Sequence, residues 1–395
     1  MSGLTGVWDQ LVDAVCRPPR DDSYTDEDLV GGQRASFRLG KARYYRQDLE
    51  LHNERGERLL CSHFRPCIVA SKDGRLPVVV YCHCNSGSRR DAEEIIYHFL
   101  PRHVTVFSLD FSGSGRSQGE WVTLGAREVD DVATAVRYLR DEGSALTIGL
   151  WGRSMGSVAS MLYARADPSI AGLVLDSPFA RLRDLMLELG SSDDSLRMPR
   201  AIAKVALAVL KRSVRRRAGF SIDDVAPVEA VPAVQCPALF GHGAEDTFVS
   251  AEHSRRLVRA YGGEARLRLF DGDHNSVRPD DFYEEAVGFM LSALRVEELL
   301  GFDLAADEED DALAAALALS MQEHRAGRDA GALPLSEEAE LALAVELSLQ
   351  TSLLEEAAVR AVVGSGEGAA GSPPPPPKQE HVEDGPGSAG PQQAS

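Results

Sequence analysis

The stretch Ile148-Gly-Leu-Trp-Gly-Arg-Ser154-Met-Gly-Ser-Val-Ala-Ser-Met-Leu-Tyr-Ala164 decides the fold. It begins as an apolar run typical of a buried strand and ends as a helix. Between the two, Gly152-Arg-Ser154-Met-Gly156 places a serine on a sharp strand-to-helix turn, where the flanking glycines make room for a tight backbone. We therefore predict that Ser154 is a nucleophile whose hydroxyl projects above a parallel sheet.

A second copy of the same pattern, Gly115-Arg-Ser117-Gln-Gly119, lacks this setting. A flexible Ser-Gly-Ser-Gly segment separates Ser117 from the preceding strand, and Glu120-Trp-Val-Thr-Leu-Gly follows it. We interpret this copy as a loop, because nothing in it resembles a strand running directly into a helix.

Apolar runs recur on both sides of the Ser154 segment and alternate with helical stretches. Residues 44–65 predict two strands joined by a turn at Asn53-Glu-Arg-Gly56. Further strands are expected at 78–81, 104–109, 146–151, 170–175, 238–240 and 265–270, and helices at 91–100, 128–140, 157–166, 250–261 and 280–294. This βαβα order predicts an α/β fold with a doubly wound, mostly parallel sheet.

The chain is long enough for one such domain and an extension. We expect an N-terminal helix and lead-in over 1–43, the α/β domain over 44–298 with a small helical cap at about 180–230, and a tail. The tail is expected to contain helices at 303–325 and 335–360 and to be disordered over 363–395, which is rich in Gly, Ser and Pro.

The negative charge of the chain is concentrated in the tail. Residues 301–395 carry 18 acidic and 4 basic side chains, which is −14 of the formal net charge of −19. An acidic chain repels phosphate backbones, so we expect no nucleic-acid partner. The start has no leader pattern, and no apolar run approaches the roughly 20 residues of a membrane helix. We expect a cytoplasmic protein, with the nucleus and the membrane surface as alternatives.

The six cysteines form no paired framework, and Cys82-x-Cys84 has neither redox nor zinc spacing. We therefore expect free thiols, no metal site and no cofactor.

A serine nucleophile needs a histidine to take its proton and a carboxylate to orient that histidine. His274 lies just past the last predicted strand, in a loop over the carboxyl edge of the sheet. Asp246 follows the preceding strand, in the adjacent loop, which gives the order Ser154, Asp246, His274. Asp176, Asp273 and Glu245 remain as alternative acids.

The oxyanion of an acyl-transfer reaction needs backbone N–H donors, one from the residue after the nucleophile and one from a loop after an early strand. Met155 is expected to supply the first. Asn85 or Cys84 is expected to supply the second, because both follow the strand that ends near Tyr81.

Several ordered blocks resemble α/β-hydrolases of the serine aminopeptidase-like group, and most closely a set of eukaryotic α/β-hydrolase-domain proteins. The blocks are His83-Cys-Asn-Ser-Gly87, Asp110-Phe-Ser-Gly113-Ser-Gly115-Arg-Ser117, Gly152-Arg-Ser-Met-Gly156, Gly241-His-Gly-Ala-Glu-Asp246, Gly272-Asp-His-Asn-Ser276 and the opening Arg17-Pro-Pro-Arg20. The resemblance implies a hydrolase with Ser154, Asp246 and His274 as its triad, acting on an acyl or peptide substrate.

One position departs from this family. Cys84 stands where the family has the glycine of a His-Gly pair. If that position requires positive φ, a Cβ there is costly and distorts the oxyanion loop.

The expected cap is basic. Lys204, Lys211-Arg212 and Arg215-Arg-Arg217 are interleaved with apolar residues. Such a rim attracts acidic substrates, anionic lipid or a nuclear-import receptor, or is the solvated face of an amphipathic helix.

The tail contains one pattern twice, 28 residues apart, with an acidic cluster before the first copy. Leucine, alanine and serine lie on one helical stripe in each copy, at i, i+3 and i+7. Both copies resemble the ubiquitin-interacting motif, although Thr351 replaces the last acid of the second. The expected ubiquitin-binding residues are Leu313, Ala316, Leu317, Ser320 and Glu323, and then Leu341, Ala344, Val345 and Ser348. The alternative is an alanine-rich helix that docks on its own domain or pairs with itself.

These observations favour a serine hydrolase of an ester, thioester or amide bond that its tail recruits to ubiquitin or ubiquitinated proteins. The alternative function is a ubiquitin-binding adaptor whose hydrolase domain is a weak or inactive scaffold.

Overall fold

The computed structural model describes residues 12–13, 15–69, 71, 73–189 and 200–301. Their strands form one nine-stranded sheet in the order β1-β2-β3-β5-β4-β6-β7-β8-β9. The strands are β1 Ser36–Leu39, β2 Ala42–His52, β3 Arg58–Pro66, β4 Leu76–Cys82, β5 Thr105–Leu109, β6 Ala145–Arg153, β7 Leu173–Asp176, β8 Ala238–Gly243 and β9 Ala265–Phe270.

The sheet is mostly parallel. The first three strands and the β3–β5 pair are antiparallel, and every pair from β5 through β4 to β9 is parallel. The predicted hairpin is confirmed as β2 and β3, whose turn contains Gly56 at φ 77°. The doubly wound α/β fold is therefore confirmed, with β1 as an additional short edge strand.

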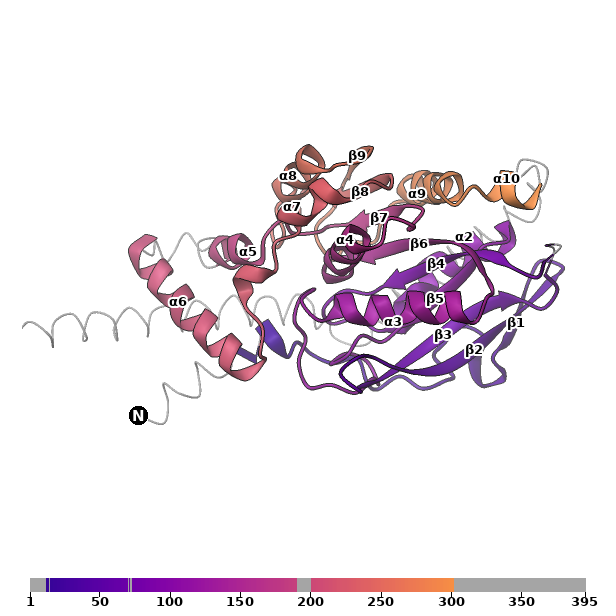
Figure 1. Cartoon of the computed structure of the whole chain (residues 1–395), viewed down its shortest axis with the longest axis horizontal. Helices are drawn as coiled ribbons and strands as arrows, with labels where there is room; N and C mark the ends of the chain where they lie inside the picture. The colour runs from indigo at the N-terminus through magenta and orange to yellow at the C-terminus, as the bar shows by residue number, and fades with distance from the viewer. Residues whose placement is uncertain (1–11, 14, 70, 72, 190–199, 302–395) are drawn as a thin grey trace, which may run out of the picture.

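Helices cover both faces of the sheet (Figure 1). One apolar core joins Val78 and Val80 of β4 to α3, α4 and α8, and a second joins Val79 and Tyr81 to α2 and α9. Neighbouring residues of β4 thus point to opposite faces, as a fully covered strand requires. The helices outside the cap are α2 Glu93–Phe99, α3 Glu128–Asp141, α4 Met155–Ala166, α8 Glu252–Ala260, α9 Asp280–Ala293 and α10 Val296–Leu300.

Between β7 and β8 the chain leaves the sheet and forms α5 Leu182–Leu189, α6 Arg200–Arg217 and α7 Pro227–Ala230. Helix α6 packs through Leu207, Leu210 and Val214, all buried, at the spacing of one helix face. In Figure 1 this helix lies at one end of the long axis and α10 lies at the other.

The N-terminal lead-in is attached to the loop after β5. Arg20 donates hydrogen bonds to the carbonyls of Ser114, Gly115, Ser117 and Gly119. Tyr24 donates to the carboxylate of Asp110 at 2.5 Å. The same carboxylate accepts the backbone N–H groups of Arg89 and Arg116. The lead-in is thus part of the packed domain.

Candidate active site

Ser154 lies at the sharp turn between β6 and α4. Its backbone has φ 50° and ψ −111°, a conformation that L residues rarely adopt. A Cβ on Gly152 would overlap the backbone of Gly156 and Ser157, and a Cβ on Gly156 would overlap the Cys82 carbonyl. The two glycines that flank the serine are therefore required by close backbone approach.

Hydrogen bonds hold this strained turn in place. The Ser154 N–H donates to the Asp176 carbonyl of β7 at 2.7 Å. The Ser157 hydroxyl lies within hydrogen-bond distance of two carbonyls, that of Gly152 at 2.6 Å and that of Asp176 at 2.9 Å. The strain at Ser154 is thus maintained by the neighbouring strand and by the first turn of α4.

His274, in the loop after β9, contacts both Ser154 and Asp246. Its Nε2 is 3.2 Å from Ser154 Oγ, and its Nδ1 is 2.7 Å from Asp246 Oδ2. The carboxylate accepts a hydrogen bond from Nδ1–H, which leaves Nε2 unprotonated and able to accept the serine proton. The structure therefore brings together the three residues expected from the sequence, in a geometry suited to proton transfer from Ser154.

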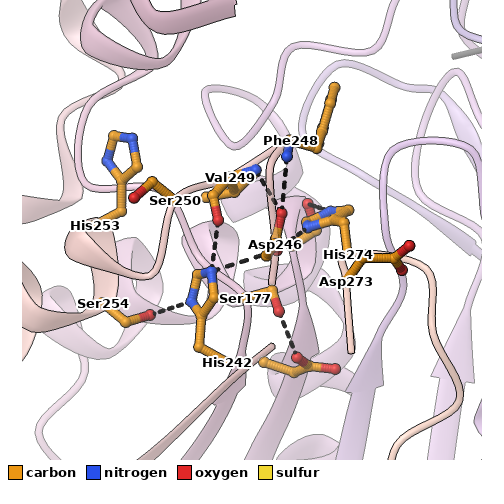
Figure 2. Close-up of polar contacts among 12 residues, drawn as sticks. Ser177, His242, Asp246, Phe248, Val249, Ser250, His253, Ser254, Asp273 and His274 are labelled. Carbon is orange, nitrogen blue, oxygen red and sulfur yellow. Dashed lines mark hydrogen bonds and ion pairs between the residues drawn. The ribbon is translucent and has the colours of Figure 1, made fainter. Parts of the chain in front are cut away.

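Asp246 is held in the loop after β8 by its second oxygen. Its Oδ1 accepts the backbone N–H groups of Phe248 and Val249 at 3.0 and 2.7 Å. Burial would raise the pKa of this carboxyl, but hydrogen bonds from His242 and His274 outweigh that effect and hold the pKa well below its ordinary value. Asp246 is therefore ionised and oriented toward His274 (Figure 2).

A second imidazole, that of His242 in β8, reaches Asp246 from below the loop (Figure 2). Its Nε2 donates to the Val249 carbonyl at 2.6 Å and lies 3.3 Å from Asp246 Oδ2, and its Nδ1 contacts Ser254 at 2.7 Å. His242 is completely buried. His242 was not among the residues predicted from the sequence, although its place in Gly241-His-Gly243, four residues before Asp246, is a usable signal.

The alternative acids have other partners. Asp176 forms a bidentate ion pair with Arg278 at 2.7 and 3.0 Å. Asp273 accepts hydrogen bonds from Asn275 and Ser276 within its own turn. Glu245 accepts the Gly272 N–H. None of these three carboxylates has a hydrogen bond to the His274 ring among the described contacts, so the geometry favours Asp246.

Arg278 also binds the loop that carries His274. Its guanidinium donates to the carbonyls of Ser276 at 2.6 Å, His274 at 3.0 Å and Asp273 at 3.4 Å. Arg278 as a whole residue is 3% exposed. Arg278 was not predicted from the sequence, because its partner Asp176 lies 102 residues away.

The loop after β4 lies beside the Ser154 turn. Cys82 pairs with Gly152 in the parallel register, and the His83 and Cys82 carbonyls border Gly156. Helix α4 begins at Met155, whose N–H is in the first turn and has no intrahelical acceptor. The oxyanion roles of Met155, Cys84 and Asn85 remain predictions.

The departure at Cys84 causes no backbone strain. The non-glycine residues with positive φ in the described chain are Ala35, His103, Leu124, Ser154, Ser177 and Arg295, and Cys84 is absent from them. Residue 84 therefore does not need the positive φ that would make a side chain costly in this loop. Burial and the nearby Asp91 carboxylate raise the pKa of the Cys84 thiol, so it stays protonated.

Ser117, from the second Gly-x-Ser-x-Gly copy, is a structural residue. Its hydroxyl donates to the Asp110 carbonyl at 2.7 Å and accepts the Leu60 N–H at 2.8 Å. A Cβ on Gly115 would collide with the Asp110 carboxylate. The interpretation of this copy as a loop is confirmed.

The expected ubiquitin-binding residues, from Leu313 to Ser348, lie outside the described residues. Within the part of the chain that the structure describes, no group of three His, Cys, Asp or Glu side chains is arranged to hold a metal ion. No described helix is both long enough and apolar enough to span a bilayer.

Two family models match the chain. One, described as alpha/beta hydrolase fold, matches residues 77–221, and the other, described as Ubiquitin interaction motif, matches residues 308–324 and 336–352. Both agree with the resemblances in the sequence.

Two bacterial relatives are described as uncharacterized. YqkD of Bacillus subtilis is 24% identical over 200 residues, or 50% of this chain, and the match covers 64% of YqkD, less than two thirds of its length. YfhR of Escherichia coli K12 is 26% identical over 247 residues, or 58% of this chain and 76% of YfhR.

Solved structures of similar fold include hydrolases. The Pyrococcus furiosus esterase Pf2001 has a TM-score of 0.51 and 20% identity, covering 70% of this chain and 98% of its own. A puromycin-hydrolyzing peptidase of Mycobacterium tuberculosis has a TM-score of 0.51 and 18% identity, and the match covers 66% of this chain and 40% of the peptidase chain. At these identities the likeness shows the fold alone.

Proposed function

We propose that this α/β-hydrolase is a serine hydrolase that cleaves an ester, thioester or amide bond through an acyl-enzyme and is recruited to ubiquitin by its tail. The observation that supports the proposal is the hydrogen-bonded series Ser154–His274–Asp246 at a strained strand-to-helix turn. Such a series is the arrangement that activates a serine for attack on a carbonyl.

In the first step, Ser154 Oγ attacks the carbonyl carbon of the substrate while His274 Nε2 takes its proton. The Asp246 carboxylate stabilises the imidazolium by accepting the Nδ1 proton in a hydrogen bond. The oxygen that becomes negative is stabilised by the Met155 N–H and by one N–H of the loop that contains Cys84 and Asn85.

The tetrahedral intermediate then collapses. The bond to the leaving group breaks, the leaving group takes the proton from His274, and the acyl group remains on Ser154. His274 next removes a proton from water, which attacks the acyl carbon. Breaking of the Ser154 ester releases the acid and returns the proton to the serine.

A fluorophosphonate probe tests this chemistry, because it phosphonylates only activated serines. The wild type should be labelled and Ser154→Ala should not. Ser117→Ala is the matched control from the second Gly-x-Ser-x-Gly copy, and it should be labelled like the wild type. Circular dichroism checks that each variant is folded. Labelling of Ser154→Ala at the wild-type rate, or no labelling of folded wild type, would contradict the proposal.

The recruitment part of the proposal is supported by the two matches to the ubiquitin interaction motif. Two motifs in one tail increase affinity for a ubiquitin chain by avidity. We also propose a cytoplasmic location, where ubiquitin conjugates occur, with the nucleus and the membrane surface as alternatives.

The second candidate function is a ubiquitin-binding adaptor with an inactive hydrolase scaffold, which the same two matches favour. Pull-down with ubiquitin chains should fall sharply when Ala316 and Ala344 become Gln and Ser320 and Ser348 become Asp. Normal pull-down by this variant would exclude these motifs as the binding site. An unlabelled but chain-binding wild type would favour the adaptor over the enzyme.

A further inference from the structure

Helix α6 of the cap has two contrasting faces. Its sequence from Arg200 to Arg217 contains no acidic residue. Leu207, Leu210 and Val214 are buried against the domain, whereas Val209, Arg212 and Arg216 follow one another at i, i+3 and i+7 on the opposite side. The exposed fraction of Val209 is 47%.

Some basic side chains of α6 have partners and some do not. Lys211 pairs with Asp223, and Arg217 pairs with Asp13. Arg212, Arg215 and Arg216 are exposed, and none has a carboxylate partner among the described residues. We call Val209, Arg212, Arg215 and Arg216 the basic cap face. It is a concentration of positive charge around an exposed apolar side chain, in a chain of net charge −19.

The segment 336–352 of the same chain has the complementary composition. It contains Glu337, Glu338, Glu340 and Glu346 and no basic residue. It also carries leucine, alanine and valine at helical spacing, so it offers acidic groups and an apolar stripe together. The arginines of the basic cap face complement the glutamates of this segment, and the exposed Val209 complements its apolar stripe.

The length of the connecting chain selects this segment over the first motif. Residue 308 follows Gly301 by seven residues, which reach at most about 25 Å, whereas a folded domain of about 300 residues is about 50 Å across. Helices α6 and α10 lie at opposite ends of the long axis (Figure 1), so the acidic residues 308–311 at the start of the first motif, at most ten residues past Gly301, fall short of α6. Residue 336 follows Gly301 by 35 residues, which span up to about 120 Å.

We infer that the basic cap face binds residues 336–352 of the same chain. The inference goes beyond the proposed function, because it concerns a contact within the chain and not the chemistry of Ser154. Since residues 336–352 also match the ubiquitin interaction motif, ubiquitin competes with the cap for this segment. Binding of ubiquitin to the second motif therefore exposes the cap, and the first motif remains available throughout.

Hydrogen exchange of the full-length protein tests the contact at residues 207–217 of α6. The tail variant replaces Glu337, Glu338, Glu340 and Glu346 by Lys. The matched control replaces Glu308, Glu309, Asp310 and Asp311 by Lys. It changes the net charge by the same amount, in a segment that lies too few residues past Gly301 to reach α6. The tail variant should exchange about tenfold faster in α6 than the wild type, and the control should exchange like the wild type.

Charge reversal of the helix provides a second measurement. Arg212, Arg215 and Arg216 replaced by Glu should restore protection of α6 when combined with the tail variant. If the helix variant does not fold, the tail variant and its control still decide the matter. Unchanged exchange of α6 in the tail variant, or equal acceleration in the control, overturns the inference.

Two further outcomes identify other occupants. Protection of α6 that rises with protein concentration indicates a tail from a second chain and overturns binding within one chain. Vesicles containing phosphatidylserine that protect α6, together with no effect of the tail variant, indicate a membrane surface and also overturn the inference. Protection that is independent of concentration and is lost on adding ubiquitin chains supports it.

Discussion

Asp176 accepts hydrogen bonds from Arg278 through both carboxylate oxygens, at 2.7 and 3.0 Å, although the two residues are 102 positions apart in the sequence. The backbone carbonyl of the same Asp176 accepts the Ser154 N–H at 2.7 Å. Arg278 in turn binds three carbonyls of the loop that carries His274. One ion pair therefore connects the turn that holds Ser154 to the loop that holds His274.

Replacing Arg278 by Ala should slow fluorophosphonate labelling by about 10- to 100-fold, because a small displacement of His274 is costly for proton transfer. The rate should be measured well below the unfolding temperature, so that loss of stability does not contribute. Arg278→Lys restores a single contact and should recover part of the rate.

The control for Arg278 is Arg65→Ala, which breaks an ion pair with Glu142 at 2.8 Å on β3. This variant should keep the wild-type labelling rate. If Arg278→Ala lowers the unfolding temperature but labels as fast as the wild type, the pair has only a structural role.

Asp246→Asn should lower the labelling rate by about 10⁴-fold while the protein stays folded, because the amide no longer favours the correct tautomer of His274. Asp273→Asn serves as the neighbouring control and should have a much smaller effect, since Asp273 contacts its own turn. A larger loss of labelling rate in Asp273→Asn than in Asp246→Asn would show that Asp246 is not the carboxylate that orients His274.

The lowered pKa of Asp246 makes a prediction about stability and pH. Burial acts against ionisation, but hydrogen bonds from His242 and His274 dominate, so the folded pKa lies below the unfolded one. The stabilisation is complete above the unfolded pKa and is lost as pH falls toward the folded pKa. Urea unfolding from about pH 6 to about pH 3 should therefore show the advantage of wild type over Asp246→Asn shrinking by about 1 kcal/mol. Parallel profiles for the two proteins would refute this.

Replacing Cys84 by Gly should lower the free energy of unfolding by about 0.5 to 1 kcal/mol, the usual cost of glycine flexibility, because no strain exists there to relieve. Thermal or urea unfolding measures the change. Gly156→Ala is the contrast, since its Cβ meets the Cys82 carbonyl and should be severely destabilising. An increase in stability of Cys84→Gly would show that the loop is strained.

The sequence predicted the central features of the site because each one follows a parallel strand directly. Ser154, Asp246 and His274 come after β6, β8 and β9, and the carboxyl ends of parallel strands meet at one edge of a sheet. The hairpin of β2 and β3 was equally predictable from the sequence, because turn-forming residues separate two strand-like runs.

Other features depend on contacts that no local pattern contains. The ion pair of Asp176 and Arg278 requires the sheet and the β9 loop to be placed in space first. His242 faces Asp246 only because the loop after β8 folds back over its own strand. The short strand β1 has only four residues and one buried side chain, so its amphipathic signal is weak. The backbone path at Cys84 likewise depends on the surrounding loop.

The contact of Arg20 with four carbonyls of residues 114–119 has a consequence for the order of folding. Arg20 is synthesised before its partners, which follow about 95 residues later in the chain. The lead-in therefore stays unpaired until the loop after β5 has been made, and its docking is a late, long-range step in folding. A chain that loses this segment should collapse around its sheet and yet leave the loop after β5 open to proteases.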